Sequence, residues 1–439
     1  MTPAKLFRAL FDQSGLIMIS RLAGAGIGLL TQLLMVRLVG PHELGLFYAA
    51  SSLAAVLGVV AAQGYPLTAA RFVGRYRNKN SEALCGIFTG QTLRESLLAA
   101  TIAAIAVIVW TLTWPGLSDG ARWPYVIAAW MILATTAINI LTGIAGGMRL
   151  FLLCYVPEGF GRPIAFFVIV AAAGAVGFDL GAMPAMLAFA AITVALALYL
   201  GIKLARDVPH IRWRGEARKP LSWRWRREAW QLIFLAVFTN FFADVGILVV
   251  VPFLSAVDVA VFGMCLKLAL LVGYFVQVGQ QMVVPDMVDA RHAGDFPRLQ
   301  RAAWRSIVSP TALTLAAMAF VYVFGPVLLP VFGPEFGRGY SALLILLAAQ
   351  LLRSLAGPSA HLLTLSGVQS VNMGLSASAI AVLLAASAAL TPKFGINGAA
   401  LAVLLTYAYW IGASAVALKR LREPSVDIVW LTWNSLRRA

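Results

Sequence analysis

The chain has 439 residues, of which 61% are hydrophobic and only 12% are charged, and its mean hydropathy is +0.85. Soluble domains usually carry about 25% charged and about 45–50% apolar residues, so the composition excludes a water-soluble globular protein. The net charge of +16 would suit a nucleic-acid-binding protein if the basic residues formed one continuous face. They instead fall in bursts between apolar stretches, which argues against nucleic acid as a partner.

Twelve stretches are long and apolar enough to cross a bilayer, which takes about 20 residues. They lie near 14–37, 44–67, 84–111, 123–147, 157–177, 181–204, 229–252, 257–284, 303–330, 340–364, 370–391 and 395–417. The first stretch contains Arg21 and Gln32 and is longer than the core of a typical signal peptide, so it is expected to be retained as a span. The fifth and sixth are divided only by Gly177–Gly181. The fold class predicted is an all-α polytopic membrane protein.

The basic residues orient these spans. With both termini in the cytoplasm, 26 of the 34 Lys and Arg residues fall in cytoplasmic segments, four fall in outer loops and four lie within spans. Such an excess in the loops of one side is the positive-inside pattern. Residues 212–230 and the tail also carry Trp among basic residues, which is typical of segments at the depth of the lipid headgroups.

The predicted organisation has two halves. Residues 1–205 form an N-terminal six-helix bundle, 206–228 a basic, Trp-rich cytoplasmic linker, 229–418 a C-terminal six-helix bundle, and 419–439 a basic tail at the interface. A shift of 215 residues superposes Val36 on Val251, Phe47 on Phe262 and Gly64 on Gly279 without a gap. This weak internal repeat suggests two parallel halves.

Several motifs, in the right order along nearly the whole chain, resemble one family. The segment 36–47, VRLVGPHELGLF, is similar to the link between spans 1 and 2 of polysaccharide flippases. Later segments that resemble the same family are Ala70–Phe72, Val261–Gly263 with Lys267-Leu268, Phe332–Phe336 and Gly395–Ala400. These flippases belong to the multidrug/oligosaccharidyl-lipid/polysaccharide (MOP) transporter superfamily.

The resemblance implies a MATE-like fold of two six-helix bundles in a V that opens alternately to either side of a bacterial inner membrane. The cargo it implies is a lipid-linked oligosaccharide, moved from the cytoplasmic to the periplasmic leaflet for O-antigen or exopolysaccharide synthesis. The implied partners are this cargo, membrane lipids and polysaccharide polymerase or assembly proteins. The lipid II flippases of the superfamily usually have two further helices, and its multidrug branch typically has fewer cations within its spans.

Ionisable residues within spans cost about 2.5–3.5 kcal/mol each on insertion scales, so they mark transport pathways by default. The residues expected to bind substrate are Arg21, Gln32, Asn240, Lys267, Tyr274 and Arg353. Arginine can replace the lost hydration of a pyrophosphate with forked hydrogen bonds. Asp244 with Lys267, and Arg94 with Glu95, are candidates either for ion coupling or for structural pairing. His361 is expected to be structural.

No cofactor, metal site or catalytic constellation is expected. The three cysteines are scattered without metal-ligand or disulfide spacing, and no phosphate-binding G-x-x-x-x-G-K-[ST] loop occurs. The glycines of Gly24–Gly28 lie within a span, where close helix packing explains them better than nucleotide binding does. A cation-coupled multidrug exporter of the same superfamily remains an alternative function. A membrane polymerase or glycosyltransferase is disfavoured because no large outer loop is predicted.

Overall fold

The computed structural model describes residues 13–178, 180–208, 217, 219–293, 295–357 and 369–421. All secondary structure in these ranges is helical. The chain divides into two compact units, Met1–Asp244 and Val245–Ala439, which we call the N-terminal and C-terminal units. Residues 1–12 and residues 422–439 of the expected basic tail lie outside the described residues. Most of residues 209–218 in the expected linker also lie outside them.

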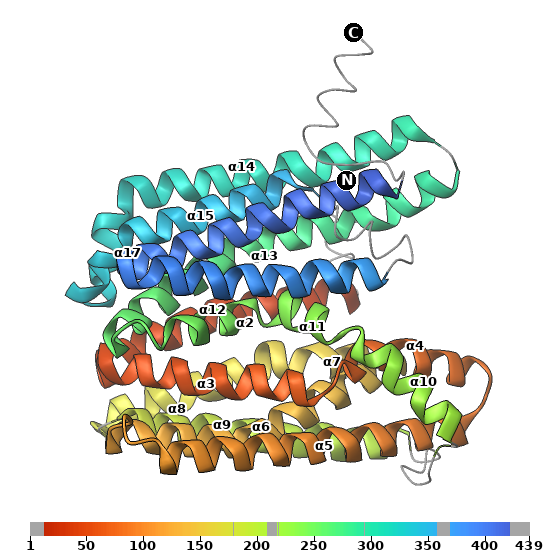
Figure 1. Cartoon of the computed structure of the whole chain (residues 1–439), viewed down its shortest axis with the longest axis horizontal. Coiled ribbons are helices and arrows are strands. Elements are labelled where there is room, and N and C mark those ends of the chain that lie inside the picture. Colours follow the sequence, from red (N-terminus) through yellow and green to blue (C-terminus); the bar gives the residue numbers. More distant parts are fainter. Residues whose placement is uncertain are drawn as a thin grey trace. The chain divides into compact units, whose positions relative to one another are not determined.

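The N-terminal unit is a bundle of long helices with short connections (Figure 1). Its helices are α2 (Gln13–Val39), α3 (Pro41–Ala61), α4 (Tyr65–Asn78), α5 (Glu82–Thr113), α6 (Asp119–Gly147), α7 (Phe151–Val156), the π-helix η1 (Pro157–Gly161), α8 (Arg162–Val176), α9 (Ala182–Asp207), α10 (Lys219–Trp230) and α11 (Ile233–Asn240). Helix α6 lies at its centre and packs against α3, α4, α5 and α9. The expected division between the fifth and sixth spans is confirmed, because α8 ends at Gly177, whose φ of 73° stops a helix.

Two local features of the N-terminal unit follow directly from the flippase-like motif between α2 and α3. Gly40 has a φ of 81°, a conformation that glycine adopts without strain, and Pro41 then begins α3. The Glu43 carboxylate accepts a hydrogen bond of 2.8 Å from the backbone N–H of Ala182. Because Ala182 is the first residue of α9, this carboxylate satisfies one of the free N–H groups at that helix start.

The C-terminal unit contains fewer but longer helices, following α12 (Phe242–Val250), which crosses the unit boundary. They are α13 (Ala256–His292), α14 (Phe296–Leu328), the 3-10 turns η2 (Leu329–Phe332) and η3 (Pro334–Gly339), α15 (Tyr340–Leu355) and α17 (Gln369–Arg420). Helix α17 is two helices joined at Gly395, whose φ of 56° and ψ of −133° are not helical, and Figure 1 shows it turning back at this point.

The internal repeat reappears in the helix boundaries. Helices α3 and α13 begin at Pro41 and Ala256, which are 215 residues apart, and α5 and α14 end at Thr113 and Leu328 with the same separation. The shift that aligned a few side chains therefore also aligns helix starts and ends. This agreement supports the interpretation of the two units as repeats of one helical plan.

The described helices include nine that are long and apolar enough to span a membrane, or ten if a bent pair counts as one span. The expected count of twelve is not established by this number. Helix α15 has only 16 residues, fewer than the 18 required of a candidate span. Helix α17 counts as a single span although it consists of two helices joined at Gly395. Both features lower the count relative to the hydropathy of the sequence.

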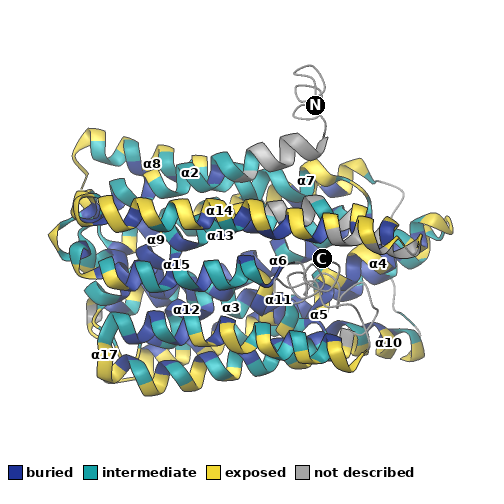
Figure 2. Cartoon of the chain, turned by 90° about the horizontal axis from the view of Figure 1, so that it is seen from above, coloured by how far each residue is buried: buried dark blue, intermediate teal, exposed yellow. Residues whose placement is uncertain are grey.

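The outer faces of several helices are apolar. Helix α14 exposes large side chains along its length, among them Leu315, Phe320, Val323 and Val327, and Figure 2 shows its exposed residues in yellow. Helix α5 exposes Leu98 and Ile102 in the same way. Faces of this size and apolarity are covered by lipid in proteins with spanning helices. The protein is a multi-pass membrane protein.

Candidate functional site

A polar cluster lies within the apolar helices of the C-terminal unit. Gln350 and Arg353 are one turn apart on α15, and the side chain of Tyr407 on α17 lies close enough to both to interact with them electrostatically. Gln350 is 1% exposed and Tyr407 is 5% exposed. We call these three residues the C-terminal polar cluster.

Space for this cluster comes from a glycine on α13. A Cβ atom placed at Gly273 would lie 2.5 Å from Oε1 of Gln350 and 3.5 Å from Nη1 of Arg353. No side chain larger than hydrogen fits there unless Gln350 moves. Glycine at 273 therefore lets two polar side chains of α15 approach the backbone of α13.

One acceptor of the C-terminal polar cluster has no hydrogen-bond partner among the described residues. Oε1 of Gln350 is buried and accepts no hydrogen bond within the described part of the chain. Leaving a buried acceptor unsatisfied costs about 1–3 kcal/mol, so such a group usually has a water, an ion or a ligand as its partner. The guanidinium of Arg353 beside it is suited to phosphate or carboxylate groups.

The other expected residues of the C-terminal unit lie on α13 and α15. Lys267 is half-buried and Tyr274 is 46% exposed. Gln280 donates a hydrogen bond of 3.1 Å to the carbonyl of Gly357, which joins α13 to the end of α15. Ser354 bonds with Thr311 of α14 at 3.0 Å. His361 and the end of the expected tenth span lie outside the described residues.

In the N-terminal unit, the face of α2 that carries Arg21, Gly24 and Gln32 is partly occupied by packing. A Cβ at Gly24 would lie 1.7 Å from the carbonyl oxygen of Gly159, so α2 and the π-helix η1 touch backbone to backbone. The packing interpretation is thus confirmed for Gly24, whereas Gly28 has open space around it. Oε1 of Gln32 is buried without a partner among the described residues, and only the backbone of Arg21 is described.

The seventh expected span is broken. The segments Lys219–Asn240 and Phe242–Val250 meet at an 80° bend, and Asn240, the last residue of α11, is exposed. Asp244 lies in the first turn of α12, where a negative charge is favourable. Its Oδ1 accepts a hydrogen bond of 3.0 Å from Ser52 of α3. The salt bridge expected between Asp244 and Lys267 stays a prediction, because the two residues belong to different units.

Glu95 has a structural partner that its sequence neighbours do not reveal. Arg226 of α10 donates to its carboxylate from two nitrogens, with Nη2 at 2.6 Å from Oε1 and Nε at 3.0 Å from Oε2 and 3.2 Å from Oε1. Tyr65 and Gln91 also donate to it, at 2.6 and 2.7 Å. Arg94 is exposed. Glu95 therefore joins α5 to α10 through Arg226, and the pairing of Arg94 with Glu95 stays a prediction.

Sequence reasoning missed Tyr407 and Arg226, both for the same reason. Each makes its contact across a gap of more than fifty residues, and neither forms a periodic polar stripe on its own helix. The second half of α17 also carries the hydroxyls of Thr406, Tyr409 and Ser414, so its sequence does not single out Tyr407. Within the described residues, no group of three or more His, Cys, Asp or Glu residues could hold a metal ion.

No protein-family model and no curated protein matches the sequence. Solved structures do match. An inward-facing multidrug resistance MATE family transporter of the MOP superfamily is 16% identical, with a TM-score of 0.69 over 91% of this chain and 94% of that one. The lipid II flippase MurJ, in an inward closed conformation, is 13% identical, with a TM-score of 0.70 over 92% of this chain and 87% of that one.

The chain has the MATE-like fold. A third structure, the MATE multidrug transporter DinF-BH in complex with a ligand, is 16% identical, with a TM-score of 0.60 and coverage of 97% of both chains. These neighbours are transporters and a flippase rather than enzymes. At such low identity the likeness establishes the fold, and the cargo has to be argued from this chain's own residues.

Proposed function

We propose that the protein is a flippase that moves a polyprenyl-pyrophosphate-linked oligosaccharide from the cytoplasmic to the periplasmic leaflet by alternating access. The observation that carries the proposal is the C-terminal polar cluster, in which Arg353 stands within apolar helices beside a buried acceptor without a partner among the described residues. A charged pyrophosphate needs such a replacement for water, and sugar hydroxyls can donate to the oxygen of Gln350. The similarity to MurJ, a flippase of lipid II, supports the same class of cargo.

In this proposal Arg21, Arg353 and Lys267 carry the pyrophosphate, while Gln32, Asn240 and Tyr274 contact the sugars. Amides and an exposed aromatic ring suit hydroxyl groups and ring faces. The setting would be a bacterial inner membrane during O-antigen or exopolysaccharide synthesis, with polymerase or assembly proteins receiving the product.

Translocation by the purified protein tests this function. The protein is reconstituted in liposomes with a fluorescent lipid-linked oligosaccharide, and the fraction that becomes accessible to a membrane-impermeant quencher is followed over time. We expect transport by the wild type and at least a tenfold slower rate for Arg353→Ala and for Arg21→Ala, because each loses one forked phosphate contact. The charge-matched control is Arg305→Ala on an exposed turn of α14. Absence of transport, or unchanged rates in both the Arg353→Ala and the Arg21→Ala variant, overturns the proposal.

A cation-coupled multidrug exporter is the second candidate, favoured by the multidrug transporters among the structural neighbours. The two candidates separate in cells. Deleting the gene removes surface polysaccharide if the cargo is a lipid-linked glycan, whereas it raises sensitivity to cationic dyes if the protein exports drugs. An exporter would also move a dye against its gradient in the same liposomes when an ion gradient is imposed.

A further inference from the structure

The helix α10 has two different faces. Its inner face carries Ser222, Trp225 and Ala229, which are buried against other helices of the N-terminal unit. Its outer face carries Trp223, Arg227 and Trp230 at helical spacing, and both indoles are about three-fifths exposed, at 60% and 61%. The basic, Trp-rich linker is therefore not uniformly interfacial, because one of its indoles belongs to the protein core.

The inner face holds α10 in a fixed position. The Trp225 ring packs edge-on against Phe88 with 5.0 Å between centroids, and its N–H donates to the hydroxyl of Tyr76 at 2.9 Å. Ser222 accepts a hydrogen bond from Gln91, and Arg226 is paired with Glu95. These contacts preorganise the outer face, so a ligand that binds there does not have to order the helix.

The outer face carries an excess of positive charge. Glu228 forms ion pairs with Arg71 of α4 and with Arg224 one turn earlier on α10. Arg227 lies over the ring of Trp223, with 5.4 Å from its Cζ to the ring centroid. Two guanidinium groups thus pair with the Glu228 carboxylate and a third lies on Trp223, so these four charged groups together carry a net charge of +2.

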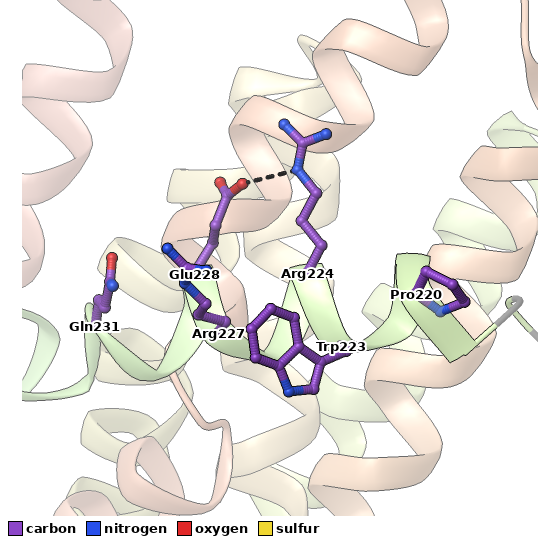
Figure 3. Close-up of a pocket in the computed structure, with 6 residues that line it drawn as sticks. All are labelled: Pro220, Trp223, Arg224, Arg227, Glu228 and Gln231. Carbon is purple, nitrogen blue, oxygen red and sulfur yellow. Dashed lines mark hydrogen bonds and ion pairs between the residues drawn. The ribbon is translucent and has the colours of Figure 1, made fainter.

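A surface depression of about 360 Å³ lies among these residues, lined by Pro220, Trp223, Arg224, Arg227, Glu228 and Gln231. Figure 3 shows the indole of Trp223 beside the arginine side chains, with Arg224 and Glu228 joined by their ion pair. A volume of this size is at the lower end of small-ligand sites, which suits a polar headgroup. Arginines present several N–H donors to the oxygens of a phosphate.

We propose that this depression binds the headgroup of an anionic phospholipid of the cytoplasmic leaflet. The aromatic stripe of Trp223 and Trp230 selects a lipid over a free anion, and it is followed along the chain by Phe234 of α11, which is 45% exposed. Indoles favour the depth of the headgroups, and a basic patch beside them gains from a negatively charged leaflet. The site would fix the linker at the membrane surface whichever cargo the protein carries.

Native mass spectrometry of the full-length protein in detergent tests the proposal. Phosphatidylglycerol or phosphatidylcholine is titrated in, and the retained lipid molecules per protein are counted. We expect the wild type to retain phosphatidylglycerol in preference, and the double variant Arg224→Gln/Arg227→Gln to retain it with about tenfold weaker apparent affinity. The control Arg301→Gln/Arg305→Gln removes the same charge from exposed positions of α14 and is expected to bind as the wild type does.

Two further measurements distinguish a phospholipid headgroup from a free phosphate compound as the ligand. Glycerol phosphate, the soluble headgroup, is expected to bind only weakly because it cannot reach the aromatic stripe. Trp223→Ala should weaken phosphatidylglycerol binding while leaving the charge unchanged. Equal retention of the two phospholipids, equal loss in the control variant, or preferential displacement of phosphatidylglycerol by polyprenyl pyrophosphate overturns the proposal. That last result would assign the site to the cargo instead.

Discussion

The second span of the N-terminal unit and its counterpart in the C-terminal unit begin 215 residues apart but end differently. The first is broken: α3 stops at Ala61, Gln63 and Gly64 have positive φ, and α4 starts at Tyr65. The second, α13, runs without interruption to His292. Pro66 explains part of the contrast, because proline lacks an N–H and restricts the residue before it, whereas Gln281 stands at the corresponding position of α13.

Tertiary contacts explain the rest of this contrast. A Cβ at Gly64 would lie 2.1 Å from the carbonyl oxygen of Ala229, so the break is the point where α4 and α10 meet. The linker helix α10 packs on α4 and on α5 within the N-terminal unit. Of the two corresponding spans, the broken one is therefore the one on which the linker helix docks.

The largest effect is expected from the indole at the centre of that docking site. Trp225→Ala should lower the free energy of unfolding by about 3–5 kcal/mol, because it empties a fully buried volume among Phe72, Tyr76 and Phe88. The exposed neighbour Trp223→Ala should cost about 0.5 kcal/mol or less. Thermal unfolding in one detergent compares the two, and equal shifts would contradict the docked position of α10.

The second largest effect is expected at Gly64, in the break between α3 and α4. Gly64→Ala should destabilise the protein by about 2–4 kcal/mol, because it places a Cβ against the carbonyl of Ala229 and forces a non-glycine residue to a φ of 73°. Gly26→Ala, in an open position of α2, should be neutral or stabilising by up to about 1 kcal/mol. The same unfolding measurement serves, and tolerance of Gly64→Ala would mean that the break does not depend on this contact.

The ion pair between α5 and α10 should have a smaller effect. Arg226→Gln leaves the Glu95 carboxylate, which is 14% exposed, with only Tyr65 and Gln91, and we expect a loss of about 1–2 kcal/mol. The value is reduced from that of a buried pair because the Arg226 side chain is 52% exposed. Since Glu95→Gln removes the uncompensated charge, the double variant should recover part of the loss. A strictly additive double variant would contradict a direct pair.

The smallest change in stability is expected in the C-terminal unit. Gln350→Met removes the buried acceptor that lacks a partner among the described residues, and should alter the free energy of unfolding by no more than about 1 kcal/mol in either direction. If the acceptor serves the cargo, transport should nevertheless fall at least tenfold. The control Gln280→Met removes a bond to Gly357 and should destabilise without that selective loss. Unchanged transport in Gln350→Met would make the C-terminal polar cluster structural.

Much of the architecture could be read from the sequence. The separation of α8 from α9 at Gly177, the starts of α3 and α13, and the packing role of Gly24 agree with the expectations from hydropathy, repeat and small-residue spacing. These features depend on residues close together in the chain. The sequence did not predict the 80° bend after Asn240, because residues 229–252 are mostly apolar and contain no proline before Pro252.

The candidate site was predicted only in part. Arg353 and Gln350 could be placed together because they lie one turn apart on one helix. Their partner Tyr407 and the space left by Gly273 could not, because those residues come from other helices. Glu95 likewise follows Arg94 directly in the sequence. In the structure its carboxylate pairs with Arg226, which is more than a hundred residues away.

The sequence by itself determined that this protein spans a membrane many times, where its helices begin and how its basic residues are distributed. Those properties follow from transfer free energies and from local backbone rules, which need no knowledge of distant contacts. Only the tertiary structure decided which polar groups are satisfied by partners and which buried ones have none among the described residues. In an apolar interior that distinction depends on which helix faces meet, and α10 shows it within one turn: Trp225 is core, and Trp223 is surface.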